Sequence, residues 1–232
     1  MTKKDNASMF RKITSYKQFG LIVCLILLII VAAIITPSMF TVDSIMSMLR
    51  NNAVYALLSV GMMIVIITGG IDLSVASTLS ITGVITSLLM NSNQSIPAFI
   101  WIIVALMIGG FCGLINGFLI GKLKMIPLIA TLGTMYAYRG LAFLISGGNW
   151  LFPHQFTPGY LSVAEKKIFG VYSIVWIAAI VFVLAGIFLG YTAPGRRIYA
   201  IGTNVESARI SGIKDDNIKM MAYSICGALA GL

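Results

Sequence analysis

The sequence predicts an all-α fold, a bundle of about seven helices that each cross a lipid membrane. Three observations lead to this prediction. Of the 232 residues, 59% are hydrophobic and 10% are charged, whereas soluble globular proteins carry about 45–50% apolar and about 25% charged residues. The apolar residues gather in runs close to the roughly 20 residues that a helix needs to cross a bilayer. The basic residues lie mainly between alternate runs, as in membrane proteins with Lys- and Arg-rich cytoplasmic loops.

The first apolar run follows a polar and basic segment, residues 1–18. This order is similar to a signal peptide, but the run from Phe19 to Ile35 exceeds the usual apolar core of about 7–15 residues. No small-residue cleavage pattern precedes Pro37. We therefore expect a retained first helix.

The remaining spans follow from the other apolar runs, and their ends are uncertain by a few residues. From Met220 only 13 residues remain, too few to cross about 30 Å at about 1.5 Å per residue. The seventh span is therefore expected to be truncated. The expected spans cover residues 19–36, 53–68, 73–90, 97–121, 125–146 and 173–191, with the last starting near 220.

The basic residues set the expected orientation. With a cytoplasmic amino terminus, the cytoplasmic segments are 1–18, 69–72, 122–124 and 192–219, which hold twelve of the sixteen Lys and Arg residues. The opposite side holds three, and Arg139 lies within a span. The net charge of +9 is thus a topology signal and no nucleic-acid partner is expected. We expect a cytoplasmic segment 1–18 and a transmembrane domain 19–232 that contains the cytoplasmic loop 192–219.

The metal-ligating residue types are sparse. Cys24, Cys112 and Cys226 lie in separate apolar runs, and His154 is the single histidine. Neither metal-ligand nor redox spacing connects them. No metal site is expected.

Two glycines and an acid separate the second and third expected spans, in Gly69-Gly70-Ile71-Asp72. Glycine costs about 1 kcal/mol relative to alanine in a helix, and an Asp at mid-bilayer costs about 2.5–3.5 kcal/mol. Two interpretations stay open. The segment can be a broken helix that lines a polar space, with Asp72 and Ser74 in it, or a cytoplasmic turn in which Asp72 caps the next helix, and both can hold together.

Arg139 is the one basic residue expected inside a span. A guanidinium there normally faces protein or water, which makes it a candidate site residue. The hydroxyls of Thr131 and Thr134 precede it and suit a polyol ligand. In the alternative interpretation, Arg139 reaches the outer interface and pairs with an acid such as Glu165.

Four glycines recur every four residues in the fourth expected span, so they share one helix face on which another helix can approach closely. Packing within the chain and dimerisation both fit this face, and Asn116 beside it can hydrogen-bond across the contact. The glycines are Gly109, Gly113, Gly117 and Gly121.

The cytoplasmic loop contains signals for a short helix. Pro194-Gly195 is expected to end the preceding span, Asn204 to cap a helix over 205–211, and Gly212 to end it. Such a capped helix fits docking of a cytosolic partner. The alternative is a basic loop that Arg196 and Arg197 hold against anionic lipid headgroups.

Four motifs follow one another between residues 20 and 232: Gly70-Ile71-Asp72-Leu73-Ser74-Val75; Asn116-Gly117; Ala130-Thr131-Leu132-Gly133-Thr134 with Tyr138-Arg139-Gly140; and Gly195-Arg196-Arg197-Ile198-Tyr199-Ala200-Ile201-Gly202 with Asn204, Ala208 and Ser211-Gly212-Ile213. Together they resemble the permease subunits of bacterial ATP-binding-cassette (ABC) importers for monosaccharides, such as the ribose, xylose and autoinducer-2 systems.

The resemblance implies a type II importer permease fold in the bacterial cytoplasmic membrane, with sugar transport as its function. It implies that the last motif is the coupling helix that docks on a cytosolic ABC ATPase subunit. It also implies a second permease subunit and an extracytoplasmic solute-binding protein as partners. The residues it assigns to ATPase coupling are Gly202, Asn204, Glu206, Ala208 and Gly212, and those to a translocation pathway are Asp72, Ser74, Asn116, Thr131, Thr134 and Arg139.

Enzymatic activity is not expected of this chain. It has no Gly-x-x-x-x-Gly-Lys-Ser/Thr phosphate-binding loop, so a partner subunit would bind ATP and Mg²⁺. A secondary transporter driven by an ion gradient is the alternative function, although Asp72 is the only acid close to a span. A membrane enzyme would need a cluster of catalytic polar residues, which the sequence does not present.

Overall fold

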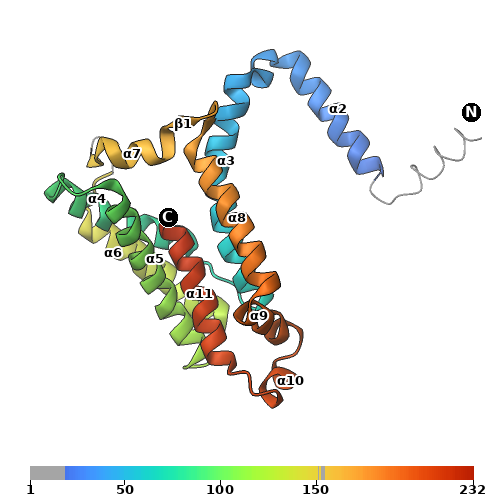
Figure 1. The fold of residues 1–232 in the computed structure, drawn as a ribbon, viewed down its shortest axis with the longest axis vertical. Helices are drawn as coiled ribbons and strands as arrows, with labels where there is room; N and C mark the ends of the chain where they lie inside the picture. Colours follow the sequence, from blue (N-terminus) through green and yellow to red (C-terminus); the bar gives the residue numbers. More distant parts are fainter. Residues whose placement is uncertain (1–18, 151, 153–154) are drawn as a thin grey trace, which may run out of the picture. The chain divides into compact units, whose positions relative to one another are not determined.

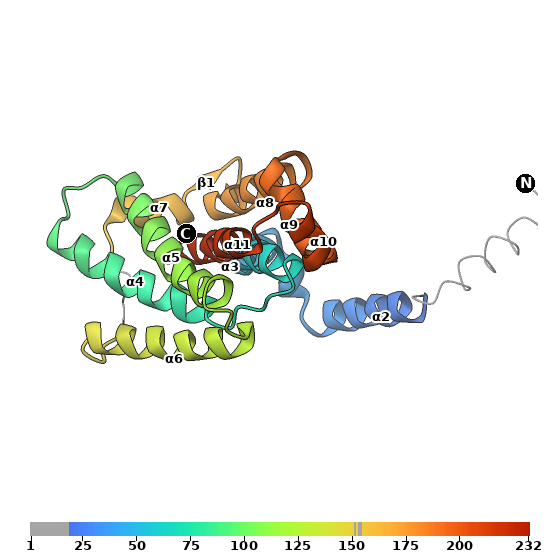
Figure 2. The same cartoon turned by 90° about the horizontal axis from the view of Figure 1, so that it is seen from below.

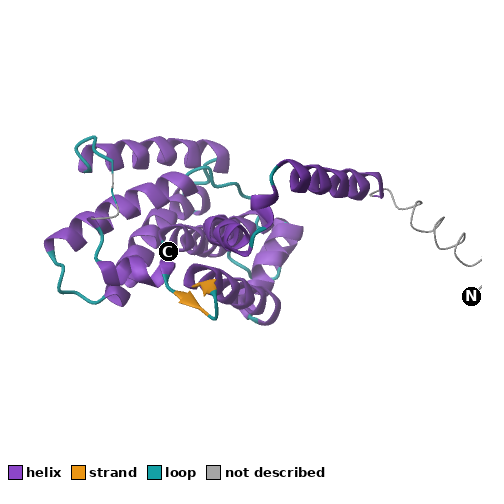
Figure 3. Ribbon diagram, turned by 90° about the horizontal axis from the view of Figure 1, so that it is seen from above, coloured by secondary structure: helices purple, strands orange, loops and turns teal. Residues whose placement is uncertain are grey.

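The computed structural model describes residues 19–150, 152 and 155–232. The described chain is almost entirely helical, with one short antiparallel strand pair (Figure 3). The predicted all-α membrane fold is thus confirmed. The expected segment 1–18 and His154 lie outside the described residues. The chain forms two compact units, Met1–Leu49 and Arg50–Leu232, which are described separately.

The first unit contains α2 (Phe19–Ile35), the short 3-10 helix η1 (Pro37–Phe40) and the start of α3 (Val42–Ile67). Pro37 disfavours a helical conformation in the residue before it, so α2 ends and η1 begins there. The Thr41 hydroxyl accepts a hydrogen bond from the Ser44 backbone N–H at 3.3 Å, which caps α3. The apolar side chains of α2 are mostly exposed, as befits a helix surrounded by lipid.

The second unit holds the rest of α3 and the other helices (Figure 1), and each expected span after the first overlaps one of these helices. Among the described residues, five helices are long and apolar enough to cross a membrane, namely α3, α4, α5, α6 and α8. The helices are α4 (Val75–Ser92), α5 (Ala98–Gly121), α6 (Pro127–Ile145), α7 (Pro158–Glu165), α8 (Ser173–Tyr191), α9 (Ala193–Thr203), α10 (Val205–Ile210) and α11 (Asp215–Gly231).

One expected boundary and the expected role of Pro194 were wrong. α3 begins at Val42, well before the expected residue 53, because polar residues such as Asp43 and Arg50 interrupt its apolar residues but no helix breaker does. Pro194 was expected to end the span that is α8, but α8 already ends at Tyr191. Pro194 lies in the first turn of α9, where its missing N–H needs no partner, and the Thr192 hydroxyl caps that helix by accepting from Gly195 N–H at 3.1 Å.

α5 and α11 form the closest helix pair and lie side by side in both views (Figures 1 and 2). The four glycines of α5 face α11. A Cβ added at Gly113 would lie 2.1 Å from the Tyr223 carbonyl oxygen, and one at Gly109 would lie 2.2 Å from that of Gly227. Because such distances are far below van der Waals contact, only glycine permits this approach. The column therefore packs within the chain, and it offers no free face for dimerisation.

The segment expected at the outer interface contains α7 and a hairpin of β1 (Lys167–Ile168) and β2 (Val171–Tyr172), with Lys167 opposite Tyr172. Phe169 and Gly170 form its two-residue turn and both have positive φ, as the common type I′ turn requires.

Candidate functional site

The loop predicted to be cytoplasmic folds into two consecutive helices, α9 and α10. The Asn204 side chain caps α10 by accepting from the Ser207 N–H at 2.9 Å. Gly212 has a φ of +79°, and the N–H groups of Gly212 and Ile213 donate to the carbonyls of Arg209 and Ala208 at 2.9 and 3.0 Å. This is the Schellman arrangement that ends helices at glycine. α10 is therefore a short helix with both ends fixed.

The residues assigned to ATPase coupling divide into two groups. Gly202 and Ala208 are structural, since a Cβ at Gly202 would lie 1.9 Å from the Ile67 carbonyl oxygen and Ala208 is buried. Glu206 is exposed on α10. Ile210, which the sequence analysis did not single out, is 83% exposed. An apolar residue at the end of a short helix predicted to be cytoplasmic was the sequence feature that could have identified Ile210 as a docking residue.

Charged residues connect α10 to the start of α11 and to the α5–α6 connection. Arg209 Nε and Nη2 donate to the two carboxylate oxygens of Asp215, each at 3.1 Å. Lys124 lies 3.3 Å from Asp215 and also pairs with Asp216. Lys122 lies 3.5 Å from Asp216. The predicted cytoplasmic segments 122–124 and 192–219 thus meet at one end of the unit.

Asp215 is the centre of this charged cluster. Its side chain is 6% exposed, and Lys219 lies 3.5 Å away on the next turn of α11. The Arg209 guanidinium, followed by Lys124 and Lys219, holds the pKa of the Asp215 carboxyl well below its usual value, against the opposing effect of burial. Sequence reasoning placed these residues in loops and missed the cluster, because Lys122 and Lys124 lie more than 90 residues along the chain from their acidic partners.

The break between α3 and α4 carries a buried polar group. Ser74 donates to Asp72 Oδ1 through its N–H at 2.9 Å and its hydroxyl at 2.6 Å. Asn116 Nδ2 donates to Ser74 Oγ at 2.7 Å and lies 3.4 Å from both Asp72 oxygens. The predicted capping role of Asp72 was wrong in one respect, since the N-cap of α4 is Ser74.

The neighbouring threonines and tyrosine complete this interior group. Thr131 Oγ1 donates to the Pro127 carbonyl at 2.8 Å, and Thr134 Oγ1 lies 3.2 Å from the Ala130 carbonyl. The Tyr223 hydroxyl donates to the Ile71 carbonyl at 3.3 Å. Asp72, Ser74, Asn116 and Thr131 are all at most 2% exposed. Their role in a translocation pathway stays a prediction.

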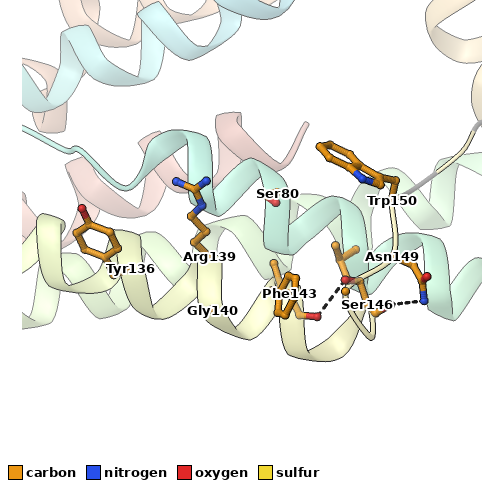
Figure 4. A pocket seen from close by; sticks show the side chains of 11 residues that line it. Ser80, Tyr136, Arg139, Gly140, Phe143, Ser146, Asn149 and Trp150 are labelled. Atoms are coloured by element: carbon orange, nitrogen blue, oxygen red, sulfur yellow. Dashed lines mark hydrogen bonds between the residues drawn. The ribbon is translucent and has the colours of Figure 1, made fainter.

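Arg139 lies apart from that interior group, in a groove between α6 and α4 (Figure 4). The groove has a volume of about 730 Å³. Ser80, Ser146 and Asn149 supply polar groups, and Tyr136 and Trp150 supply aromatic rings. Figure 4 shows the Arg139 side chain extending from α6 into this space.

Arg139 has no ion pair or hydrogen bond within the described part of the chain. Its proposed pairing with Glu165 was wrong, because Glu165 pairs with Arg50 at 2.6 Å. The Arg50 guanidinium also lies 5.2 Å from the centre of the Tyr172 ring. The Arg139 guanidinium therefore keeps its hydrogen-bond donors available for a ligand or water. No group of three or more potential metal ligands occurs among the described residues.

Comparison with known proteins identifies the family. A family model described as a branched-chain amino acid transport system, permease component, matches residues 44–232. The ribose import permease protein RbsC of Haemophilus influenzae is 37% identical over 220 residues, which cover 90% of this chain and 66% of that protein. RbsC of Escherichia coli K12 is 34% identical over 230 residues, covering 96% and 69%.

The autoinducer 2 import system permease protein LsrC of Escherichia coli O9:H4 is 29% identical over 225 residues, covering 97% of this chain and 64% of that protein. The chain spans about two thirds of the length of these curated relatives. No solved structure matches it. The matched family and the five apolar helices together indicate a multi-pass protein of the inner membrane. The chain belongs to the permease family that includes the permease subunits of bacterial monosaccharide ABC importers.

Proposed function

We propose that this chain is a permease subunit of an ABC importer and that it moves a small sugar across the cytoplasmic membrane. The observation that carries this proposal is α10, a short helix capped at both ends that presents Ile210 and Glu206 at the cytoplasmic end. A cytosolic ATPase would dock there and would bind ATP and Mg²⁺. The names of the relatives support ribose or an autoinducer-2-like compound as the solute.

The proposed assembly also contains a second permease subunit and an extracytoplasmic solute-binding protein, and the amino terminus of this chain lies in the cytoplasm. ATP binding would displace α10 and change the packing of the membrane helices, which would open the pathway to alternate sides. Family membership favours this account over a transporter driven by an ion gradient. ATP hydrolysis is assigned to the partner and not to this chain.

The groove around Arg139 is the part of the proposed pathway whose chemistry suits a sugar. A planar guanidinium donates in parallel to neighbouring oxygens, and aromatic side chains present apolar faces with polar edges. Hydroxyl and amide groups of Ser80, Ser146 and Asn149 complete the lining. These groups fit a ligand that has several hydroxyls.

Docking of the ATPase can be tested by substituting Ile210 in the full-length protein. Ile210→Asp places a charge on the exposed apolar docking residue, so we expect recovery of the ATPase in mild detergent to fall about tenfold or more, as for the loss of an interface hot spot. Phe169→Ser is the matched control, because Phe169 is 93% exposed at the outer hairpin. Its ATPase recovery should equal that of the unchanged protein.

Two results would contradict the docking proposal. One is full ATPase recovery with Ile210→Asp. The other is purification of the unchanged protein without an ATPase, with uptake of radiolabelled ribose that follows an ion gradient and ignores ATP. The second result would make the secondary transporter the better account.

The groove can be tested by comparing Arg139→Gln with Arg139→Lys. Loss of a hydrogen bond to a charged group costs about 1.5–3 kcal/mol, so we expect Arg139→Gln to lower the initial rate of ribose uptake about tenfold or more. Arg139→Lys keeps the charge but loses the planar guanidinium. Its rate of ribose uptake should lie between those of Arg139→Gln and the unchanged protein. ATPase recovery should stay normal in both. Normal uptake with Arg139→Gln would remove Arg139 from the pathway.

A further inference from the structure

Asp215 joins three segments of the cytoplasmic end that are separate in sequence. It receives two hydrogen bonds from Arg209 of α10, at 3.1 Å each. Lys124, from the connection between α5 and α6, lies 3.3 Å away. Asp215 itself begins α11. One carboxylate thus holds α10, the α5–α6 connection and α11 together.

Burial makes this junction persistent. The Asp215 side chain is 6% exposed, while those of Arg209 and Lys124 are 47% and 50% exposed. A buried carboxylate that loses its cations is strongly unfavourable, so α10 cannot move away from α11 without a large loss of stabilisation. Lys124 has a φ of +57°, a conformation that non-glycine residues keep only where surrounding contacts hold it. The ion pairs of Lys124 with Asp215 and Asp216 supply such contacts.

α11 forms a rigid unit with α5 beyond this junction. An added Cβ at Gly117 would lie 2.5 Å from the Met220 Cα, and the same close approach recurs at Gly113 and Gly109. Two backbones in direct contact along their length have no intervening side chains that could adjust. A displacement applied to the start of α11 is therefore expected to move α5 and α11 together.

The α5–α11 pair reaches the break between α3 and α4. Tyr223 of α11 is fully buried, and its hydroxyl donates to the Ile71 carbonyl at 3.3 Å. A Cβ at Gly70 would lie 2.4 Å from that hydroxyl. Asn116 of α5 contacts the same break through Ser74 at 2.7 Å. A continuous series of contacts thus connects α10, through Asp215 and the α5–α11 pair, to the break between α3 and α4.

We propose that Asp215 is a positioning residue that transmits the displacement of α10 to the α5–α11 pair and so to the break at Gly69–Asp72. This inference rests on the proposed function, because it requires an ATPase that moves α10. Asp215 acts through Arg209 and Lys124. It contacts neither the solute nor the ATPase.

The test reconstitutes the full-length permease with its ATPase and binding protein in proteoliposomes and measures radiolabelled ribose transported per ATP hydrolysed. Arg209→Gln removes the link to α10 but leaves Asp215 paired with Lys124 and Lys219, so the fold is retained. Asp215→Asn removes the junction itself. We expect each to lower the ribose-to-ATP ratio about fivefold or more, in the range of known coupling between sites. The double variant should be no worse than the more severe single one, because both break the same link.

Glu165→Gln is the matched control, since it breaks an ion pair of 2.6 Å at the outer end, and its ratio should equal that of the unchanged protein. An unchanged ratio in assembled Arg209→Gln complexes would overturn the inference, as would an equal loss with Glu165→Gln. Loss of ATPase recovery with Arg209→Gln would also overturn it, because Arg209 would then be a docking residue. If Asp215→Asn fails to fold, Lys124→Gln replaces it. Absence of ATP-dependent ribose uptake in the unchanged complex would instead reject the proposed function.

Discussion

The two ends of the second unit hold their charged residues in different ways. At the end proposed to face outward, called the outer end, Arg50 and Glu165 pair at 2.6 Å, but their side chains are 41% and 53% exposed. At the end proposed to face the cytoplasm, called the cytoplasmic end, the contacts of Asp215 are longer, from 3.1 to 3.5 Å, and its side chain is 6% exposed. Exposed pairs contribute little to stability whatever their distance. Burial, and not the length of the contact, makes the cytoplasmic cluster the stronger constraint.

This difference fits the proposed roles of the two ends. The outer pair can break and re-form at little cost as the outer surface changes shape. The cytoplasmic cluster must move as a body, because separation would leave a buried carboxylate without its cations. A rigid cytoplasmic end is what the transmission of force from α10 requires.

The largest effect on the cytoplasmic end is expected from a substitution at Gly202, where α9 contacts the end of α3. In Gly202→Ala the added Cβ would lie 1.9 Å from the Ile67 carbonyl oxygen, and overpacking of this kind costs about 1–3 kcal/mol or more. We expect a lower melting temperature of the purified protein and loss of ATPase recovery. Gly190→Ala is the control on α8, because nothing lies within 4 Å of its added Cβ.

The control should behave in the opposite way. Alanine is favoured over glycine in a helix by about 0.5–1 kcal/mol, so Gly190→Ala should leave the melting temperature unchanged or raise it. Equal melting temperatures for the two variants would show that the close contact of α9 with α3 does not hold the cytoplasmic end.

The sequence predicted the helices well because each depends on a local pattern. Apolar runs of about 20 residues give the spans, and Asn204 and Gly212 give the ends of α10 through caps that involve neighbouring residues. α9 was missed because its first turn contains Pro194-Gly195, and both residue types are unfavourable in the interior of a helix. The early start of α3 was missed because polar residues such as Asp43, Ser47 and Arg50 interrupt the apolar residues of its first turns.

The site residues were predicted less well because their roles depend on distant partners. Nothing near Asp215 in the sequence shows that Lys124 will lie beside it, and nothing near Glu165 shows that its cation is Arg50 rather than Arg139. The glycine column indicated close packing, but only the structure assigns it to α11. Local patterns thus predict elements and caps, while the charged contacts between elements require the fold.

The contributions of the two ends to stability can be compared directly by neutralising one acidic residue at each end. Asp215→Asn loses charged hydrogen bonds in a buried position, each worth about 1.5–3 kcal/mol, whereas Glu165→Gln loses an exposed pair worth about 0–1 kcal/mol. At neutral pH we therefore expect a clearly lower melting temperature for Asp215→Asn and almost no change for Glu165→Gln. Equal losses would contradict the distinction between the two ends.

The pH dependence of the Asp215 effect separates charge from shape. The cations around Asp215 lower its pKa in the folded protein, so the folded state binds fewer protons than the unfolded state, whose Asp pKa is about 3.9. The stabilisation is therefore complete above that value and is lost as the pH falls below it. Over the range from about pH 7 to about pH 2, the difference in melting temperature between the unchanged protein and Asp215→Asn should be constant down to about pH 4. Below that it should shrink, because the unfolded chain takes up a proton at this carboxylate before the folded protein does. A constant difference across this range would mean that the asparagine disturbs packing, and that the charge of Asp215 does not hold α10 to α11.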